Sequence, residues 1–213
     1  MTKAVILISG RGSNMRSIVE AGTGLDVRAV ISNRPNAAGL EWAHAQGIAT
    51  HVVDHKLHAS REDFEAALAK VIDEQAPDLV LLAGFMRILT PGFIARYPRR
   101  IVNIHPSLLP SFPGLHTHRQ ALNAGVKVHG ATVHVVTEAL DSGPVIVQGV
   151  VPVMDGDTEE ALAERVLQVE HRIYPQVVRW FVEGRIEFAA GNAVQVRGTG
   201  ASGDTMISPR NTE

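Results

Sequence analysis

Ala4-Val5-Ile6-Leu7-Ile8-Ser9-Gly10-Arg11-Gly12-Ser13-Asn14 is the stretch of sequence that decides the fold. Its first part, Ala4 to Ile8, is a short and continuous apolar run, which predicts a buried strand. A tight glycine-rich loop follows, and Met15 to Ala21 has the pattern of a helix. A buried strand that runs through a tight loop into a helix is typical of a parallel sheet covered by helices.

The same alternation continues along the rest of the chain. Further strands are predicted at 27–31, 50–53, 79–83, 100–104, 128–136 and 144–153, and helices at 37–46, 60–75, 91–97, 117–123 and 157–183. The continuous run at 79–83 suits a central strand buried on both faces, and a turn joins the last two strands, which predicts antiparallel pairing toward the C-terminal part. We therefore expect an α/β fold, Rossmann-like, with a mostly parallel twisted sheet and helices on both faces.

Local signals predict where several helices begin and end. Ser60 is expected to cap its helix with Asp63 in the capping-box position, and Asp157 to cap the longest helix together with Glu160. Pro175 is expected to interrupt that longest helix. A small hairpin is predicted at 185–196, residues 1–197 are expected to form a single domain, and 198–213 a flexible tail, because the tail is rich in Gly, Ser, Thr and Asn.

Composition excludes several classes of function. The 213 residues include 20 Lys and Arg against 22 Asp and Glu, for a net charge of -2, so no overall field attracts nucleic acid or an anionic membrane. The absence of cysteine excludes disulfides, thiolate nucleophiles and cysteine zinc sites. The N-terminal apolar run is too short for a signal sequence and no stretch approaches membrane-spanning length, so a cytoplasmic protein is expected.

The first glycine-rich loop predicts a phosphate site. Backbone N–H groups at the start of a helix, together with the helix dipole, favour an anion, and Ser13 and Asn14 can add side-chain hydrogen bonds. An ordinary turn that happens to be rich in glycine is the alternative. A dinucleotide site is disfavoured, because Met15 stands where a third glycine is needed and Ser32-Asn33-Arg34 where an acidic residue is needed. Arg34 leaves NADP open.

Asn103 and His105 are the candidates for chemistry. They follow one another by two positions at the end of a predicted parallel strand, so their side chains share a face at the edge where ligands bind in open α/β sheets. An amide and a protonated imidazole can stabilise an oxyanion, and a nearby carboxylate favours the charged imidazole. Asp141 is the candidate carboxylate. From the residues alone, His105 could equally be structural and Asp141 could equally serve only its turn.

Further motifs carry a resemblance to a known family. The ordered set comprises Gly10-Arg11-Gly12-Ser13-Asn14, Ala83-Gly84-Phe85-Met86-Arg87-Ile88-Leu89, Asn103-Ile104-His105-Pro106-Ser107-Leu108-Leu109-Pro110, Pro113-Gly114-Leu115-His116-Thr117-His118, Leu140-Asp141-Ser142-Gly143-Pro144 and Glu170-His171-Arg172-Ile173-Tyr174-Pro175. This set closely resembles the folate-dependent formyltransferases, over a span from about Val5 to Gly184.

The resemblance implies a specific reaction and a set of site residues. The formyl group of 10-formyltetrahydrofolate, a co-substrate, would pass directly to the amine of N1-(5-phosphoribosyl)glycinamide in de novo purine biosynthesis. Asn103, His105 and Asp141 would be catalytic. The substrate would be bound by Gly12, Ser13, Asn14 and Glu170. The folate would be bound by Arg61, Met86, Arg87, Ile88, Leu89, Thr137, Glu138, Ala139, Leu140 and Asp141.

Competing functions differ in what else they require. Methionyl-tRNA formyltransferase needs a further domain for RNA, a formyltetrahydrofolate hydrolase needs a regulatory domain, and a non-catalytic nucleotide-binding module has no use for Asn103, His105 and Asp141. His51, His55 and His58 lie close together, but their acidic neighbour is only Asp54, so a solvated loop is favoured over a metal site. We expect no metal, no nucleic-acid or membrane partner, and a monomer or homodimer.

Overall fold

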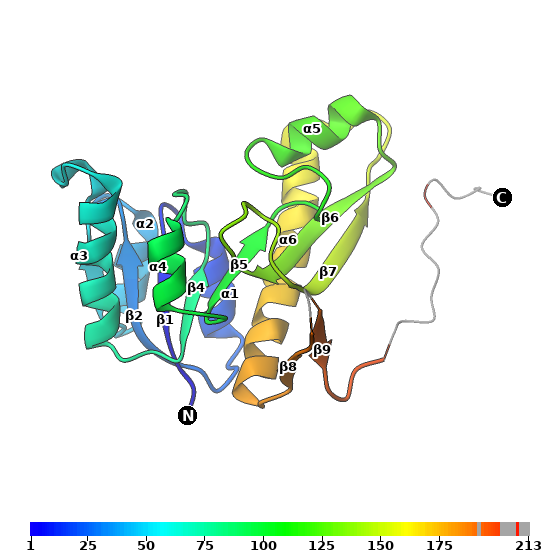
Figure 1. Cartoon of the computed structure of the whole chain (residues 1–213). Helices are drawn as coiled ribbons and strands as arrows, with labels where there is room; N and C mark the ends of the chain where they lie inside the picture. Colours follow the sequence, from blue (N-terminus) through cyan, green and yellow to red (C-terminus); the bar gives the residue numbers. More distant parts are fainter. Residues whose placement is uncertain (191–192, 201–207, 209–213) are drawn as a thin grey trace.

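A computed structural model describes residues 1–190, 193–200 and 208. Its centre is a seven-stranded sheet in the order β3-β2-β1-β4-β5-β6-β7 (Figure 1). The strands are β1 (Lys3–Ile8), β2 (Asp26–Ser32), β3 (Thr50–Val52), β4 (Leu79–Leu82), β5 (Ile101–His105), β6 (Val128–Val135) and β7 (Val145–Pro152). The strands from β1 to β5 pair in parallel, and β6 is antiparallel to both of its neighbours. The expected mostly parallel sheet, with antiparallel pairing toward the C-terminal part, is confirmed.

Helices cover both faces of this sheet. They are α1 (Ser13–Glu20), α2 (Ala38–Ala45), α3 (Arg61–Glu74), α4 (Pro91–Arg96), α5 (Thr117–Ala124) and α6 (Glu159–Val182), with a short 3-10 helix η1 (His55–Leu57) that the sequence pattern did not predict. Side chains of α1, α2, α5 and α6 pack in one core layer. Side chains of α3 and α4 pack in the other. The two-layered arrangement follows from the alternation of β1.

Strand β1 feeds both layers. Ala4, Ile6 and Ile8 join the layer under α1 and α6, while Val5 and Leu7 join the layer under α3. All five side chains are fully buried, and burying one such aliphatic side chain contributes about 1.5–3 kcal/mol. A continuous apolar run was therefore the correct sign of a central strand, because none of the five residues from Ala4 to Ile8 faces water.

Two predictions about the longest helix are wrong. Thr158, not Asp157, caps α6, since its hydroxyl accepts the Ala161 N–H. Asp157 is taken by Arg165 instead, whose two terminal nitrogens lie 2.7 and 2.9 Å from its carboxylate oxygens. The helix also continues through Pro175. A proline inside a helix costs about 3 kcal/mol, and here the surrounding α6 side chains are buried against the sheet, which holds the helix together.

The other predicted helix ends lie within two residues of the observed ones. Ser60 caps α3 by accepting the Asp63 N–H, and Gly47 follows the α2 C-cap with a φ of 75°. Helix α1 begins at Ser13, two residues earlier than predicted. The predicted hairpin is formed by β8 (Ile186–Phe188) and β9 (Val194–Val196). Most of the predicted tail lies outside the described residues.

The strand order reverses between β1 and β4. The connection from β1 packs α1 on one face, and the connection after β4 packs α4 on the other. In such sheets the carboxyl ends of the strands border a crevice at this point. The loops that leave β1, β4 and β5 therefore come together at one edge of the sheet. In the part of the chain that is described, no helix is both long and apolar enough to cross a membrane.

Candidate active site

His105 and Asp141 meet in the folded chain. His105 is the last residue of β5, and its Nδ1 lies 3.6 Å from Oδ2 of Asp141 in the loop between β6 and β7. The two side chains are only 7% and 9% exposed, so solvent screens their attraction weakly. The separation is that of an ion pair and is too long for a hydrogen bond. The convergence expected from the sequence is present.

The other ring nitrogen of His105, Nε2, carries a hydrogen. Nε2 lies 3.1 Å from the carbonyl oxygen of Phe112, and a carbonyl can only accept, so Nε2 carries a hydrogen. With Nδ1 turned toward a carboxylate, the arrangement is suited to an imidazolium that has N–H groups on both sides. A reacting oxygen could accept the Nε2–H hydrogen bond of His105 only by taking the place of the Phe112 carbonyl.

Asp141 is held by its own turn and by the loop between β5 and α5. Gly114 donates its N–H to Oδ2 at 2.8 Å, which fixes the carboxylate oxygen that faces His105. The backbone of Asp141 is in the left-handed region, with a φ of 48°, a conformation that Asp tolerates better than most residues. Gly143 follows so close to the Val135 carbonyl that a Cβ there would overlap it. Asp141 therefore both forms part of this turn and supplies the candidate catalytic carboxylate.

Asn103 is connected to this pair through His134. Asn103 and His134 are directly opposite one another on β5 and β6, and Asn103 Nδ2 lies 3.2 Å from His134 Nε2. His134 donates Nδ1–H to the Val135 carbonyl at 3.1 Å, and burial lowers the pKa of its imidazole. A neutral ring with hydrogen on Nδ1 must accept at Nε2. The Asn103 amide is therefore oriented with one N–H toward His134, and the second N–H remains for another acceptor.

His134 also approaches the carboxylate, since its Nε2 lies 4.0 Å from Asp141 Oδ1. Its position on an alternating strand was the only signal in the sequence, and it indicated packing or a supporting role. Strand register, which the sequence does not reveal, is what sets His134 beside Asn103. Asn103, His105, His134 and Asp141 consequently form one cluster of polar side chains in the crevice.

The first loop has the geometry expected of an anion site. Gly12 stands at the N-cap of α1 with a φ of 71°, and a Cβ there would lie 3.2 Å from the Cα of Gly39. Only glycine fits this position without strain. Ser13 and Asn14 form the first turn of α1, so their backbone N–H groups lead the helix. The predicted strand, glycine turn and helix N-terminus are all present.

Glu170 joins this loop from α6. Asn14 donates its Nδ2–H to Oε2 of Glu170 at 2.6 Å. Burial raises the pKa of Glu170, and the hydrogen bond from Asn14 offsets part of that effect. Oδ1 of Asn14 is also buried, with no hydrogen-bond partner among the described residues. The structure thus brings together Ser13, Asn14 and Glu170, which the resemblance grouped as substrate-binding residues.

The residues expected to bind folate lie on neighbouring loops. Met86 to Leu89 belong to the loop between β4 and α4, and Thr137 to Asp141 to the loop between β6 and β7. Large apolar side chains of both loops are exposed: Met86 by 65%, Ile88 by 58% and Leu140 by 51%. Exposed apolar groups beside polar backbone suit a flat ring system.

Arg87 contacts the helix that begins at Arg61. Arg61 is the first residue of α3, one turn before Phe64. The guanidinium of Arg87 stacks 5.2 Å from the centre of the Phe64 ring, which is a cation–π contact. The contact places Arg87, in the β4–α4 loop, against the first part of α3.

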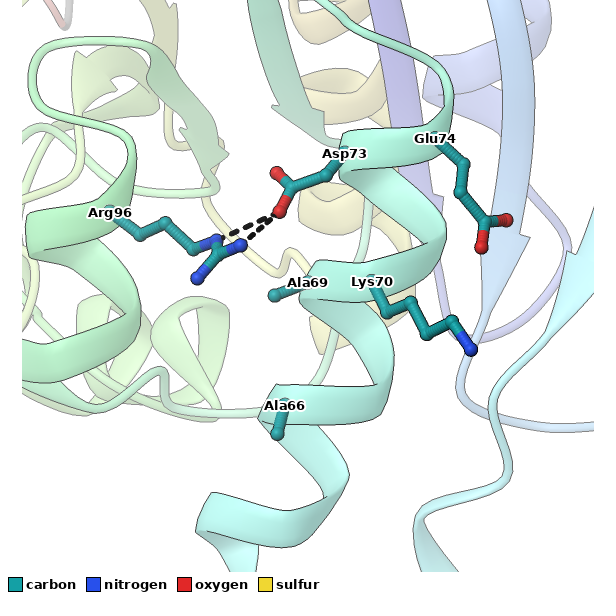
Figure 2. A pocket seen from close by; sticks show the side chains of 6 residues that line it. All are labelled: Ala66, Ala69, Lys70, Asp73, Glu74 and Arg96. Carbon is teal, nitrogen blue, oxygen red and sulfur yellow. Dashed lines mark hydrogen bonds and ion pairs between the residues drawn. The ribbon is translucent and has the colours of Figure 1, made fainter.

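A surface groove elsewhere on the molecule does not belong to this site. It has a volume of about 470 Å³ and is lined by Ala66, Ala69, Lys70, Asp73, Glu74 and Arg96. Figure 2 shows it between α3 and the helix that carries Arg96, with Arg96 paired to Asp73. Five of these residues lie on α3, from its middle to its end, and Arg96 is the last residue of α4. The end of α3 leads to the beginning of β4, so the groove lies toward the amino ends of the strands. His55, from the histidine group of the sequence, instead contacts Asn33, and no group of three metal-binding side chains occurs among the described residues.

Comparisons with known proteins agree with this geometry. A family described as formyl transferase matches residues 2–178. Phosphoribosylglycinamide formyltransferase of Escherichia coli strain K12 is 53% identical over 190 residues, covering 86% of this chain and 88% of that protein. The trifunctional purine biosynthetic protein adenosine-3 of Homo sapiens is 42% identical over 196 residues, 90% of this chain but 19% of that protein. A crystal structure of glycinamide ribonucleotide transformylase 1 from Symbiobacterium toebii has a TM-score of 0.89 and 46% identity, covering 92% of this chain and 94% of that one.

Proposed function

The chain belongs to the formyl transferase family, and from this premise we propose that it is the enzyme that formylates glycinamide ribonucleotide in de novo purine biosynthesis. The donor is 10-formyltetrahydrofolate, and the acceptor is the amine of N1-(5-phosphoribosyl)glycinamide. The observation that carries the proposal is the approach of His105 to Asp141 at 3.6 Å, beside an Asn103 amide oriented by His134.

The reaction follows from what these side chains can do. The substrate amine attacks the formyl carbon, and the carbonyl oxygen becomes an oxyanion. His105, acting as the imidazolium paired with Asp141, and the second N–H of Asn103 donate to that oxygen. For this, the Nε2–H of His105 turns from the Phe112 carbonyl to the formyl oxygen as substrate binds. The C–N bond to the folate nitrogen then breaks, and the proton lost by the attacking amine moves to the folate nitrogen. No covalent bond to the enzyme forms.

Substrate binding is assigned to the two ends of the crevice. The phosphate of the ribonucleotide would bind the backbone N–H groups of Gly12, Ser13 and Asn14, with the positive end of the α1 dipole behind them. Glu170 would accept a hydrogen bond from a hydroxyl or amine of the same substrate. The folate ring would lie among the exposed side chains of Met86, Ile88 and Leu140, with the backbone of 137–141 beside it.

A formyl-transfer assay tests the proposal. Purified protein is incubated with a formyl-folate donor, and release of the deformylated folate is followed by absorbance. Glycinamide ribonucleotide, formyl-accepting charged tRNA and water alone are compared as acceptors. We expect turnover that depends on glycinamide ribonucleotide. Turnover with water or tRNA at an equal rate would assign a different acceptor, and binding of the ribonucleotide without transfer at any pH would contradict an enzymatic function.

Three further expectations belong to this proposal. The proposed reaction needs no metal ion. Loss of activity with a chelator, followed by recovery with zinc, would contradict this expectation. Residues 1–197 are proposed to act as one domain, so a chain that ends there should keep its activity. We place the enzyme in the cytoplasm, with small-molecule partners and no nucleic-acid or membrane partner.

A further inference from the structure

One serine hydroxyl joins the two loops that the proposed function assigns to the two substrates. The backbone pairing of β1 with β4 ends where Ala83 donates to the Leu7 carbonyl at 2.9 Å and Ser9 donates to the Gly84 carbonyl at 3.1 Å. Gly84, with a φ of 78°, then turns the chain away. Met86 nevertheless donates its N–H to Oγ of Ser9 at 2.8 Å. The side chain of Ser9 thus extends the pairing beyond the end of the sheet.

Asn33 sets the direction of that hydroxyl. Ser9 donates its single hydroxyl hydrogen to Oδ1 of Asn33 at 2.6 Å, so only the lone pairs of Oγ remain for the Met86 N–H. Both side chains are almost fully buried, at 4% for Ser9 and 2% for Asn33. The backbone of Asn33 is held in turn by His55, whose Nδ1 donates to the Asn33 carbonyl at 2.9 Å. A run of hydrogen bonds therefore crosses the carboxyl ends of β2, β1 and β4.

The places of these residues in the chain give the hydrogen bonds a function. Ser9 directly precedes the glycine loop from Gly10 to Asn14, and Met86 is the first residue of the segment 86–89. We propose that Ser9 and Asn33 are positioning residues for formyl-folate binding. The Asn33 amide aims the Ser9 hydroxyl, which holds the Met86 N–H and so sets segment 86–89 against the loop that binds phosphate. This inference rests on the proposed function.

The effect of losing this hydroxyl falls on binding and not on the chemical step. Asn103, His105 and Asp141 lie on β5 and on the loop after β6, and their side chains are hydrogen-bonded to other residues than Ser9 and Asn33. Removing the hydroxyl leaves the Met86 N–H to water and frees the start of segment 86–89. One hydrogen bond of ordinary strength corresponds to about a 3- to 10-fold change in affinity.

The test compares variants in kinetics and in direct binding. Ser9→Ala and Asn33→Leu should each raise the KM for formyl-folate about 3- to 10-fold with kcat within about twofold, and Asn33→Asp should stay near wild type because it keeps an acceptor for Ser9. The Kd of a non-transferable folate analogue, measured by fluorescence titration, should rise in parallel. Ser32→Ala is the matched control. Ser32 is also buried, and within the described part of the chain its hydroxyl bonds the backbone of Arg34 alone, at 2.9 and 3.0 Å.

Each outcome decides the inference. An unchanged KM and Kd in both Ser9→Ala and Asn33→Leu would overturn it, as would an equal rise in Ser32→Ala or a loss confined to kcat. Thermal unfolding of every variant shows whether it is folded, and the Asn33 pair carries the test if Ser9→Ala is not. If the wild-type protein binds the folate analogue but transfers no formyl group, the proposed function is wrong. The Kd values of the variants still test whether Ser9 and Asn33 position the folate site.

Discussion

Replacing Asn103 by alanine is the sharpest test of the catalytic cluster. In the structure one N–H of the amide goes to His134 Nε2 at 3.2 Å, and the reaction uses the other N–H, which would meet the oxyanion. Losing one preorganised donor of this kind costs about 2.7–4 kcal/mol of transition-state stabilisation, or about 100- to 1000-fold in kcat. The same donor is used weakly in the ground state, so the KM values should change by no more than about threefold.

Folding should survive the change. The lost bond to His134 is a neutral hydrogen bond, worth about 1 kcal/mol net, against a total stability of about 5–15 kcal/mol for a typical domain. Steady-state formyl transfer with both substrates saturating measures kcat, and thermal unfolding measures stability. Asn103→Asp serves as the comparison of similar size, because a carboxylate cannot donate and should be at least as slow. A kcat within threefold of wild type in both variants would refute the assignment of Asn103 to the oxyanion.

Three further predictions concern stability and the shape of the site. Burial raises the pKa of Glu170, so the folded state favours the protonated acid, and its contribution to stability is lost as pH rises above the ordinary value of 4.5. Glu170→Gln should therefore flatten the decline of urea-unfolding free energy with rising pH, and an identical pH profile would contradict this. Gly143→Ala should lower kcat more than 10-fold by displacing the turn of Asp141 from the Val135 carbonyl, whereas full activity would mean that the turn adapts. Tyr174→Phe removes a hydroxyl that lies 2.9 Å from the Val102 carbonyl and 3.1 Å from that of Leu82, and should lower the free energy of unfolding by about 1–3 kcal/mol. An unchanged urea midpoint would show that those carbonyls are satisfied without it.

The fold was predictable because local patterns and tertiary packing agree. Ala4 to Ile8 is apolar without alternation, and β1 is indeed buried on both faces. Ser60 caps α3 as expected. One error arose where two neighbouring residues could do the same task. Asp157 and Thr158 are both good caps, and the choice fell to Thr158 because Arg165, almost two turns along α6, binds the carboxylate.

The candidate site divides in the same way. The positions of Asn103, His105 and Asp141 in their motifs pointed to them before any coordinates, and the resemblance named their companions on the glycine loop and on the β4–α4 loop. The contact of His134 with Asn103 could not be predicted from the sequence, because it depends on the register that sets the two residues opposite one another. Ser9 and Asn33 could not be found either, since hydroxyls and amides at strand ends are common and their partners are far along the chain.

By itself, the sequence determined which segments are strands and helices, and it predicted the strand ends and the side chains that we propose for ligand binding and oxyanion stabilisation. Those predictions depend on period, on turn residues and on residue type, all of which are local. Only the tertiary structure decided which nitrogen of His105 faces Asp141, which way the Asn103 amide points, and that one serine hydroxyl ties the glycine loop to the β4–α4 loop. Those facts depend on strand register and on packing at distances of a few ångströms, and residues far apart in the chain must meet before they exist.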